Sequence, residues 1–599
     1  MKAIKLHLYY TIILLAISGC GKNSEESSNW DINTEGVSPS ENAGDWIFIH
    51  ELSDSESLNP YTGNDASGSY ILANIFETML KQDNNTLEYK PWLATSLPKV
   101  SKDKLVYTFT LREDITFSDG TPLTGEDVIF TLKAIKNPLT EAAPQRNYFK
   151  DVARAELVGG DIYTIRFYCS EVFFKQATMI GTMLIMPKHI YDPEGLMDSY
   201  SFKELEDIQR QYLDDSESSN LEDQSYYKFA ELFNSHGTSR NPLGSGPYIL
   251  KEWVSNDRVV LEKNVNYWKQ KEEGSKNLVS RMIHKTVKTH EAALTSAKAQ
   301  ELDVVRSVPP KMFYDQTKSE KFKRNLNKTS SYYPNYSYIG WNNDHHIFGD
   351  KRVRKAMTHL CNRNAIIEAL YYGDAQIAKG NIYFKRPEYH TGIDPLDFDP
   401  KIAKQLLAEA GWEDTDGDGV LDKVINGKRT PFEFMIKTNQ GNDMRKKIAL
   451  LLIEEAKKVG IKADLQTMEW AIYLDDVRAH KFDAMILGWV FGVDEPDPYQ
   501  VFHSSQSIAR GSNSVSFNNP RADKLVELNR KEFDADKRKE YIYEFQEILL
   551  DEQPYTFLVC SQSHLIYHKR FRGVNIYPFR PGYDLQEWWV PNSMMMYTK

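Results

Sequence analysis

Residues 106–112 (Val-Tyr-Thr-Phe-Thr-Leu-Arg) are followed by Phe-Ser-Asp-Gly-Thr-Pro-Leu at 117–123 and by an apolar-periodic stretch at 124–136. Apolar and polar side chains alternate over 106–112, which predicts a strand, and the Asp-Gly and Pro that follow predict a loop. Thr124 is a favourable N-cap for a helix, and Asp127 occupies the capping-box position that Glu more often fills. The stretch therefore predicts a strand, a loop and a helix in succession.

Strands and helices also alternate in the second half of the chain. Amphipathic helices are predicted at 350–372, 400–410 and 445–459, and strands at 432–437, 462–468 and 484–488. Such alternation is typical of an α/β protein. The polar, charged segment 192–241 is predicted to be a surface excursion.

The N-terminal end has the pattern of a bacterial lipoprotein. Two lysines precede an apolar run at 9–17, which is shorter than the roughly 20 residues that span a bilayer. Small residues then precede Cys20, so we predict a signal peptide at 1–19 and lipidation of Cys20. The alternative is an ordinary signal peptide with an incidental cysteine. Residues 20–44, rich in Ser, Asn and Glu, predict a flexible tether that anchors the body outside the cytoplasm, in the periplasm or at the cell surface.

The composition limits the kinds of partner. The chain of 599 residues has a formal net charge of −11 and no basic cluster, which argues against nucleic acid. Besides Cys20 it contains Cys169, Cys361 and Cys560, an odd number that excludes a complete disulfide framework. A folded body of this length predicts two or three subdomains.

The sequence lacks enzyme signatures. It contains no Gly-x-Ser-x-Gly motif, no Walker-type phosphate loop and no dinucleotide-binding glycine pattern. Residues 290–294 (His-Glu-Ala-Ala-Leu) have leucine where a zinc helix needs its second histidine. His345, His346 and His359 could bind a metal such as nickel, but adjacent histidines usually point apart, which favours solvated loop residues. We expect a binding protein.

Six stretches occur in an order that resembles the family 5 extracellular solute-binding proteins, which serve peptide and nickel ABC importers. Each stretch is weak alone, but together they are specific and cover nearly the whole body of the chain. They are Ser57–Pro60 with Asn74–Leu80, Pro91–Ala94, Tyr107–Gly120, Gly244–Tyr248 with Asn264–Trp268, Lys351–Ala356, and Gly411–Trp412.

The resemblance implies an α/β, two-lobed periplasmic-binding-protein-like fold of the class II, cluster C type. Closure of the two lobes over a ligand is a hinge motion. One lobe would combine 45–80, 186–312 and 553–599, the other would span 313–552, and an extra subdomain would occupy 81–185.

The resemblance also implies a function. A monomeric lipoprotein would capture oligo- or dipeptides and deliver them to the permease and ATPase of an ABC importer, with no cofactor required. One alternative is the same scaffold binding a nickel chelate, haem or an oligosaccharide. Another is a sensory or chaperone-like surface lipoprotein. A cleft carboxylate would favour peptides, whereas a histidine cluster or an arginine would favour a chelated metal.

Residues 488–498 (Gly-Trp-Val-Phe-Gly-Val-Asp-Glu-Pro-Asp-Pro) resemble the family's ligand-binding stretch. By that resemblance Asp494 would pair with the α-ammonium of a peptide, since an ammonium restores charge balance to a carboxylate in a closed cleft. The spacing from Trp489 is loose, so Asp497 is a rival, and the whole turn could be a solvated loop. Trp489 would either stack on the ligand or fill the core.

Three further residues occupy places where the family meets its ligand. Tyr70 follows the Asn-Pro turn at 59–60, and Trp341 and Asn342 follow Gly340. Backbone groups in these places could pair with a peptide as an added strand. Core or turn roles remain open for Trp341 and Asn342.

An acidic loop at 414–422 resembles the start of a calcium-binding EF-hand loop. Asp414, Asp416, Asp418 and Asp422 could provide the oxygen ligands, but Ile425 stands where a bidentate Glu would be needed. The alternative to a structural Ca²⁺ is a tight acidic turn.

Overall fold

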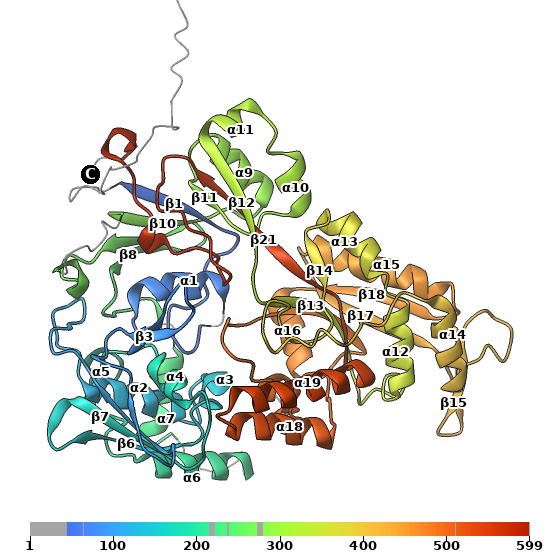
Figure 1. Ribbon diagram of the computed structural model, residues 1–599, viewed down its shortest axis with the longest axis horizontal. Helices are drawn as coiled ribbons and strands as arrows, with labels where there is room; N and C mark the ends of the chain where they lie inside the picture. Colours follow the sequence, from blue (N-terminus) through green and yellow to red (C-terminus); the bar gives the residue numbers. More distant parts are fainter. Residues whose placement is uncertain are drawn as a thin grey trace, which may run out of the picture.

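The computed structural model describes residues 45–63, 65–214, 222–235, 239–271, 279–508 and 511–597. These residues form two α/β lobes, with a smaller subdomain beside the first lobe (Figure 1). The predicted signal peptide, the tether and Cys20 lie outside the described residues. Among the helices that are described, none is long and apolar enough to cross a membrane.

The sheet of the first lobe takes strands from both ends of the chain. Within the described residues the strand order is β12-β21-β11-β1-β10-β9-β8, with β14 added to β21. Ile47 and Ile49 of β1 face α1, while Phe48 faces α9–α11, as the two-residue period of a strand requires. The bounds are β1 Trp46–Glu51, α1 Ala66–Ile75, β8 Tyr248–Val254, β9 Arg258–Lys263, β10 Arg281–Thr286, α9 His290–Lys298, β11 Val304–Val305, α10 Pro310–Asp315, α11 Glu320–Asn325, β12 Leu326–Tyr332, β14 Ala375–Ile377 and β21 Val559–His568.

The subdomain is built around the stretch at 106–136. Its sheet has the order β4-β5-β7-β6 in the part of the chain that the structure describes, and α2 packs on it. The predicted capping box is confirmed. The Thr124 side chain accepts a hydrogen bond from a backbone N–H of the first turn, and the Asp127 side chain accepts one from the backbone N–H of Thr124. The bounds are β2 Leu80–Gln82, β3 Tyr89–Pro91, β4 Lys99–Val100, β5 Val106–Thr110, α2 Gly125–Lys136, α3 Ala143–Arg146, β6 Val152–Val158, β7 Asp161–Cys169, α4 Gln176–Gly181 and α5 Lys188–Tyr191.

The segment predicted to be a surface excursion contains two helices, α6 (Phe202–Asp214) and α7 (Ser225–Asn234). Phe229 and Phe233 of α7 are buried and stack with ring centroids 5.3 Å apart. Phe229 also packs edge-on against Phe130 of α2. The prediction is wrong for α7, because positions four residues apart fall on one helix face and here complete the core of the subdomain.

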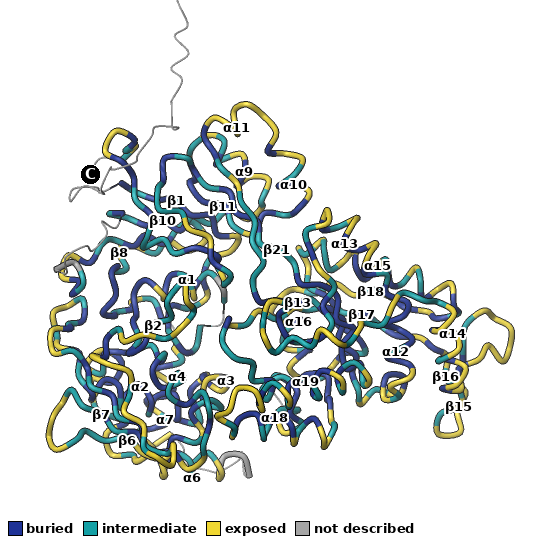
Figure 2. Tube along the Cα trace, viewed as in Figure 1, coloured by how far each residue is buried: buried dark blue, intermediate teal, exposed yellow. Residues whose placement is uncertain are grey.

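The second lobe is a sheet with helices on both faces. Its order among the described strands is β18-β17-β19-β13-β20. One face packs against α12–α15 and the other against α16–α19. Figure 2 shows the central strands buried and the β15–β16 hairpin exposed at the edge of the lobe. The bounds are β13 Asn335–Trp341, α12 Lys351–His359, α13 Arg363–Tyr371, α14 Pro400–Glu409, β15 Asp422–Ile425, β16 Lys428–Pro431, β17 Glu433–Asn439, α15 Asp443–Lys457, β18 Lys462–Met468, α16 Trp470–Arg478, β19 Ala484–Val490, α17 Tyr499–Phe502, α18 Pro520–Lys531, α19 Ala535–Glu552 and β20 Tyr555–Phe557.

Two short connections link the sheets directly: residues 333–334 join β12 to β13, and residue 558 joins β20 to β21. β12 pairs with β21 in the first sheet, whereas their neighbours β13 and β20 pair with each other in the second. The sheets therefore divide the chain at different residues from the expected 312/313 and 552/553. Strand β12, after residue 313, still pairs in the first sheet, and strand β20, after residue 553, still pairs in the second.

Candidate ligand-binding cleft

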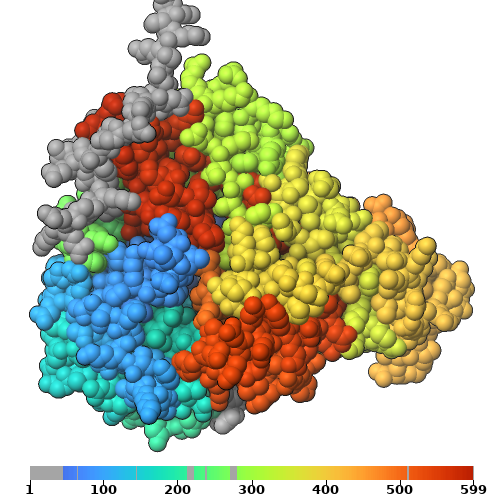
Figure 3. Space-filling view, in the orientation of Figure 1, coloured from blue at the N-terminus to red at the C-terminus, as the bar shows by residue number. Residues whose placement is uncertain are grey.

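A cavity of about 540 Å³ lies where the subdomain meets the second lobe. The subdomain contributes Tyr148, Lys175 and Met179, and the second lobe contributes Arg386 and side chains between residues 489 and 502. The subdomain and α18–α19 lie directly against each other in the space-filling view (Figure 3). A molecule that fills this cavity contacts both walls.

A second cavity, of about 700 Å³, lies between the first lobe and the second. Arg306 lines it from the first lobe, and Arg445 and Trp470 line it from the second. Tyr336, Trp489 and Val490 line both cavities, so the two adjoin along β19 and together form the candidate cleft between the lobes.

Strand β19 forms one wall of this cleft. It pairs with β13 along its whole length, but with β17 through Ala484 and Met485. In the part of the chain that the structure describes, no strand pairs with the β17-facing edge of residues 487–490. Trp489 and Val490 line the cavities. The backbone N–H and C=O groups on this edge of β19 are therefore available for pairing with another strand.

Asp494 lies in the loop after β19 and forms an ion pair with Lys175 of the subdomain. Its carboxylate folds back over Gly492, where a Cβ atom would lie 2.3 Å from Asp494 Oδ1. The predicted ligand residue is therefore in the cleft, and its charge is already balanced by an ammonium group from the opposite wall.

Asp497 is held differently. It accepts two hydrogen bonds from Arg530 Nε, both 3.0 Å, and one of 2.7 Å from Arg530 Nη2. The side chains are 4% and 9% exposed. Burial opposes the charge of Arg530, but the Asp497 carboxylate outweighs it and raises the pKa of the guanidinium. Asp497 lines the cavity, but its oxygens are committed to fixing the loop on α18.

Tyr70 lies at the other end of the cleft, between two arginines. The guanidinium of Arg306 is 4.0 Å from its ring centroid, and Arg580 Nε donates to its hydroxyl over 2.6 Å. Arg306 also pairs with buried Glu51, which accepts from His284 Nδ1 at 2.8 Å. Burial opposes ionisation of Glu51, but Arg306 and His284 together hold the pKa of the carboxyl below its usual value.

The sequence profile of the bacterial extracellular solute-binding proteins, family 5 Middle, matches residues 88–510. The chain belongs to this family. Its members bind solutes outside the cytoplasm, which puts this family 5 protein among extracellular binding proteins and not among enzymes.

Relatives of the family 5 protein cover almost its full length. Oligopeptide-binding protein AppA of Bacillus subtilis (strain 168) is 29% identical over 598 residues, or 98% of each chain. A dipeptide-binding protein of Pseudomonas aeruginosa is 25% identical over 535 residues, 86% of this chain and 89% of its own. The structure of Bacillus subtilis AppA in complex with a nonapeptide matches with a TM-score of 0.76 and 27% identity, covering 92% of this chain and 100% of that one. The two-lobed α/β fold is thereby confirmed.

Two residues expected at the ligand are buried in the family 5 protein. Trp341 is 0% exposed, packs against Phe348 and donates from Nε1 to Thr556 Oγ1 at 3.1 Å. Asn342 is buried and donates to the carbonyl oxygens of His480 and Phe482. Neither is among the residues that line the two cavities, and ligand contact by either stays a prediction. Strand β13 is central in its sheet, where its side chains meet helices.

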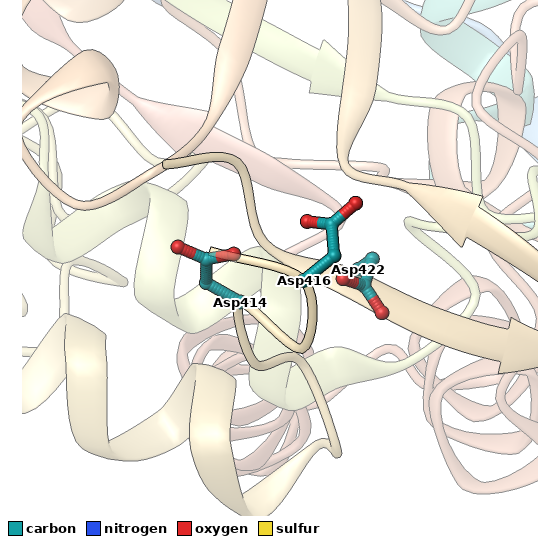
Figure 4. A group of neighbouring side chains, drawn as sticks. All are labelled: Asp414, Asp416 and Asp422. Carbon is teal, nitrogen blue, oxygen red and sulfur yellow. The ribbon is translucent and has the colours of Figure 1, made fainter. Parts of the chain in front are cut away.

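The acidic loop lies on the far side of the second lobe, before the β15–β16 hairpin. Asp414, Asp416 and Asp422 come within 4.8 Å of one another (Figure 4). Arg429 pairs with both Asp416 and Asp422, and holds the pKa of each carboxyl below its usual value. Asp418 is not part of this group, because its Oδ1 accepts from the Val420 N–H at 2.8 Å. Calcium binding stays a prediction.

The histidines named as a nickel alternative are not gathered at one point. His345 and His346 are neighbours, with ring centroids 4.1 Å apart, while His359 Nδ1 is engaged by the Asp397 carbonyl. Among the described residues, the one group of three or more neighbouring metal-ligating side chains is the aspartate group at 414–422.

Sequence reasoning missed Lys175, Arg306, Arg445 and Arg580, all of which line the cleft. None lies in a recognisable motif, and each comes from a different part of the chain. A search for cations opposite the 488–498 stretch would have needed the tertiary structure.

Proposed function

We propose that this protein captures peptides in the cleft between its lobes and delivers them to an ABC importer. The observation that carries the proposal is the cleft itself. Two adjoining cavities, of about 540 and 700 Å³, are lined from both lobes. Each falls within the range of about 300–1,000 Å³ that holds one small ligand, so together they have room for several peptide residues.

The open edge of β19 suits an extended peptide. A peptide laid beside residues 487–490 would pair its own N–H and C=O groups with the strand, which gives affinity without a fixed side-chain sequence. The aromatic wall at Tyr336 and Trp489 would accept varied side chains. The peptides named for the Bacillus subtilis and Pseudomonas aeruginosa relatives support this ligand class.

Capture would proceed by closure of the lobes. The two crossings, at 333–334 and 558, lie side by side and provide the natural hinge. A peptide that contacts both walls binds the closed state more tightly than the open one, and so shifts the population towards closure.

Anchoring and delivery complete the proposal. The N-terminal pattern supports lipidation of Cys20 and a tether over 20–44, which would hold the body near a membrane. A protein that captures a ligand without changing it needs a transporter to take the ligand up. The resemblance to proteins that serve ABC importers supports a permease and its ATPase as the partner.

Mass spectrometry of the small molecules released from the denatured body, residues 30–599, tests the ligand class. The same body is then incubated with a random hexapeptide library, and captured peptides are measured after gel filtration. We expect a mixture of short peptides in both experiments. Release of a metal chelate or a sugar, together with no capture from the library, would overturn the proposal.

A further inference from the structure

A lysine side chain of the protein already supplies a positive charge to Asp494 in the cleft. Lys175, from the subdomain, pairs with Asp494, from the second lobe, and both line the same cavity. Their side chains are 13% and 24% exposed, so the pair is largely shielded from water. In such surroundings, removing one charge of the pair leaves the other shielded from water without its counter-ion, which is costly.

Lys175 is held in place by contacts on either side of the ion pair. The backbone N–H of Phe174 donates to the carbonyl oxygen of Arg530 over 2.9 Å, across the boundary between the lobes. The guanidinium of Arg530 is 4.9 Å from the Phe173 ring centroid, and that of Arg538 is 4.4 Å from the Phe174 ring centroid. These contacts fix the backbone that carries Lys175 against the second lobe.

Asp494 is equally constrained. Its carboxylate lies close over Gly492, so a Cβ atom at that position would push the carboxylate aside. Tyr89 faces it from the subdomain, and burial, with a smaller contribution from the Asp494 charge, raises the pKa of that phenol. The phenol stays uncharged, and the cation that pairs with this carboxylate is Lys175.

We propose that Lys175 is a specificity-determining residue, which supplies the cation for Asp494 and lets the cleft take peptides that present no free α-ammonium there. The ligand class is peptides with a blocked N-terminus, or with an internal segment at this position. The inference rests on the proposed function, peptide capture.

Charge balance is the physical reason. A peptide ammonium at Asp494 would have to displace Lys175 or share one carboxylate with it, which places two positive charges in a site shielded from water. An acylated N-terminus or an internal peptide group adds no charge. Removing the Lys175 ammonium would leave Asp494 without its counter-ion, and a free peptide ammonium would then be favoured.

A paired peptide library measures this preference. One half of a random hexapeptide library keeps its free N-terminus and the other half carries an N-acetyl group. Equal amounts are mixed with limiting protein, and mass spectrometry gives the ratio of captured free to acetylated peptides. Wild type is compared with Lys175→Met and with the matched control Lys531→Met. Lys531 also forms an ion pair between subdomain and second lobe, with Glu171 at 2.7 Å, but both side chains are 55% exposed and outside the cavity.

We expect a ratio near one for wild type and for Lys531→Met. Lys175→Met should favour the free half by about tenfold, which corresponds to about 1.4 kcal/mol. The double variant Lys175→Met, Asp494→Asn should return the ratio to near one. Comparing ratios between variants cancels any effect of acetylation on solubility.

Two outcomes would overturn the inference. Wild type could already favour the free half by about tenfold, with no change in Lys175→Met, or the Lys175→Met ratio could stay near one. Capture of the free half by Lys175→Met shows that the variant is folded. If wild type captures neither half, peptide capture itself has failed, which is a different result.

Discussion

The acidic loops at 414–422 and 494–497 differ in what their carboxylates contact. Each contains carboxylates paired with an arginine: Arg429 pairs with Asp416 and Asp422 of the first loop, and Arg530 pairs with Asp497 of the second. Arg429, in strand β16 of the peripheral hairpin, is 44% exposed, whereas Arg530, in α18 beside the cleft, is 9% exposed. The same pairing therefore shapes a surface turn in one place and a wall of the candidate binding cleft in the other.

The difference teaches that an acidic motif acquires its role from what packs against it. At 414–422 the neighbours are the loop's own backbone amides and one exposed arginine. At 494–497 they are side chains from other parts of the chain. Lys175, for example, lies about 300 residues away in the sequence. The ion pair therefore connects this loop of the second lobe to the subdomain.

The largest expected effect follows from Arg530→Met. Removing the guanidinium leaves the Asp497 carboxylate buried without its partner, which should cost about 3 kcal/mol of the free energy of unfolding of the second lobe. Guanidinium denaturation followed by tryptophan fluorescence measures it. Arg429→Met is the matched control and should lower the denaturation midpoint less, because Asp422 keeps hydrogen bonds from Thr415 and the arginine itself is exposed. Equal shifts in the two variants would remove the distinction between the loops.

Trp489→Ala should give the next largest effect. The side chain lines both cavities, so its loss should weaken peptide capture by about tenfold or more, as expected for a central aromatic contact. Titration with a pool of captured peptides measures the change in Kd. Trp253→Ala, in β8 and outside the cleft cavities described here, is the control. Unchanged capture by Trp489→Ala would show that the ligand lies elsewhere.

Acid should distinguish the loops in a third way. Arg429 lowers the pKa of Asp416 and Asp422 in the folded state, so their ion pairs stabilise the hairpin at pH values above the usual Asp value of about 4. That stabilisation is lost as the pH falls through the lower, folded-state pKa. Hydrogen exchange of 414–431 should show protection that falls in acid in wild type, and weaker protection with a smaller dependence on pH in Arg429→Met. Identical pH profiles would contradict this, and residues 491–498 provide the internal reference.

Calcium should give the smallest effect. A Ca²⁺ ion at 414–422 would have to compete with Arg429 for Asp416 and Asp422, so millimolar calcium should raise the unfolding temperature of wild type slightly at most. Arg429→Met frees those oxygens and should respond more strongly. Equal responses in wild type and variant would show that Arg429 does not compete for the site.

Local patterns predicted local structure well. The strand and capped helix at 106–136 form with nearly the predicted bounds, because a capping box and a two-residue alternation depend on neighbours in the chain. The surface prediction for 192–241 was wrong at α7, because Phe229 packs against Phe130 of α2 and Phe233 against Tyr191 of α5, both distant in the sequence.

The candidate site residues also fall into two groups: those that a local sequence pattern predicts and those that depend on tertiary contacts. Trp489 and Asp494 lie in the cleft and follow from one contiguous stretch. Trp341 was placed at the ligand by a motif, but burial in a central strand gives it a core role. Lys175 has no sequence signal, since its importance depends on its position opposite Asp494.

The sequence by itself determined the order of strands and helices, the family and one wall of the cleft, because all three are recorded in short contiguous patterns. The tertiary structure decided which charges are paired, which aromatic residues line the cavity and which lobe each strand joins. Those properties depend on contacts between distant segments, and burial then sets how strongly each charge needs its partner.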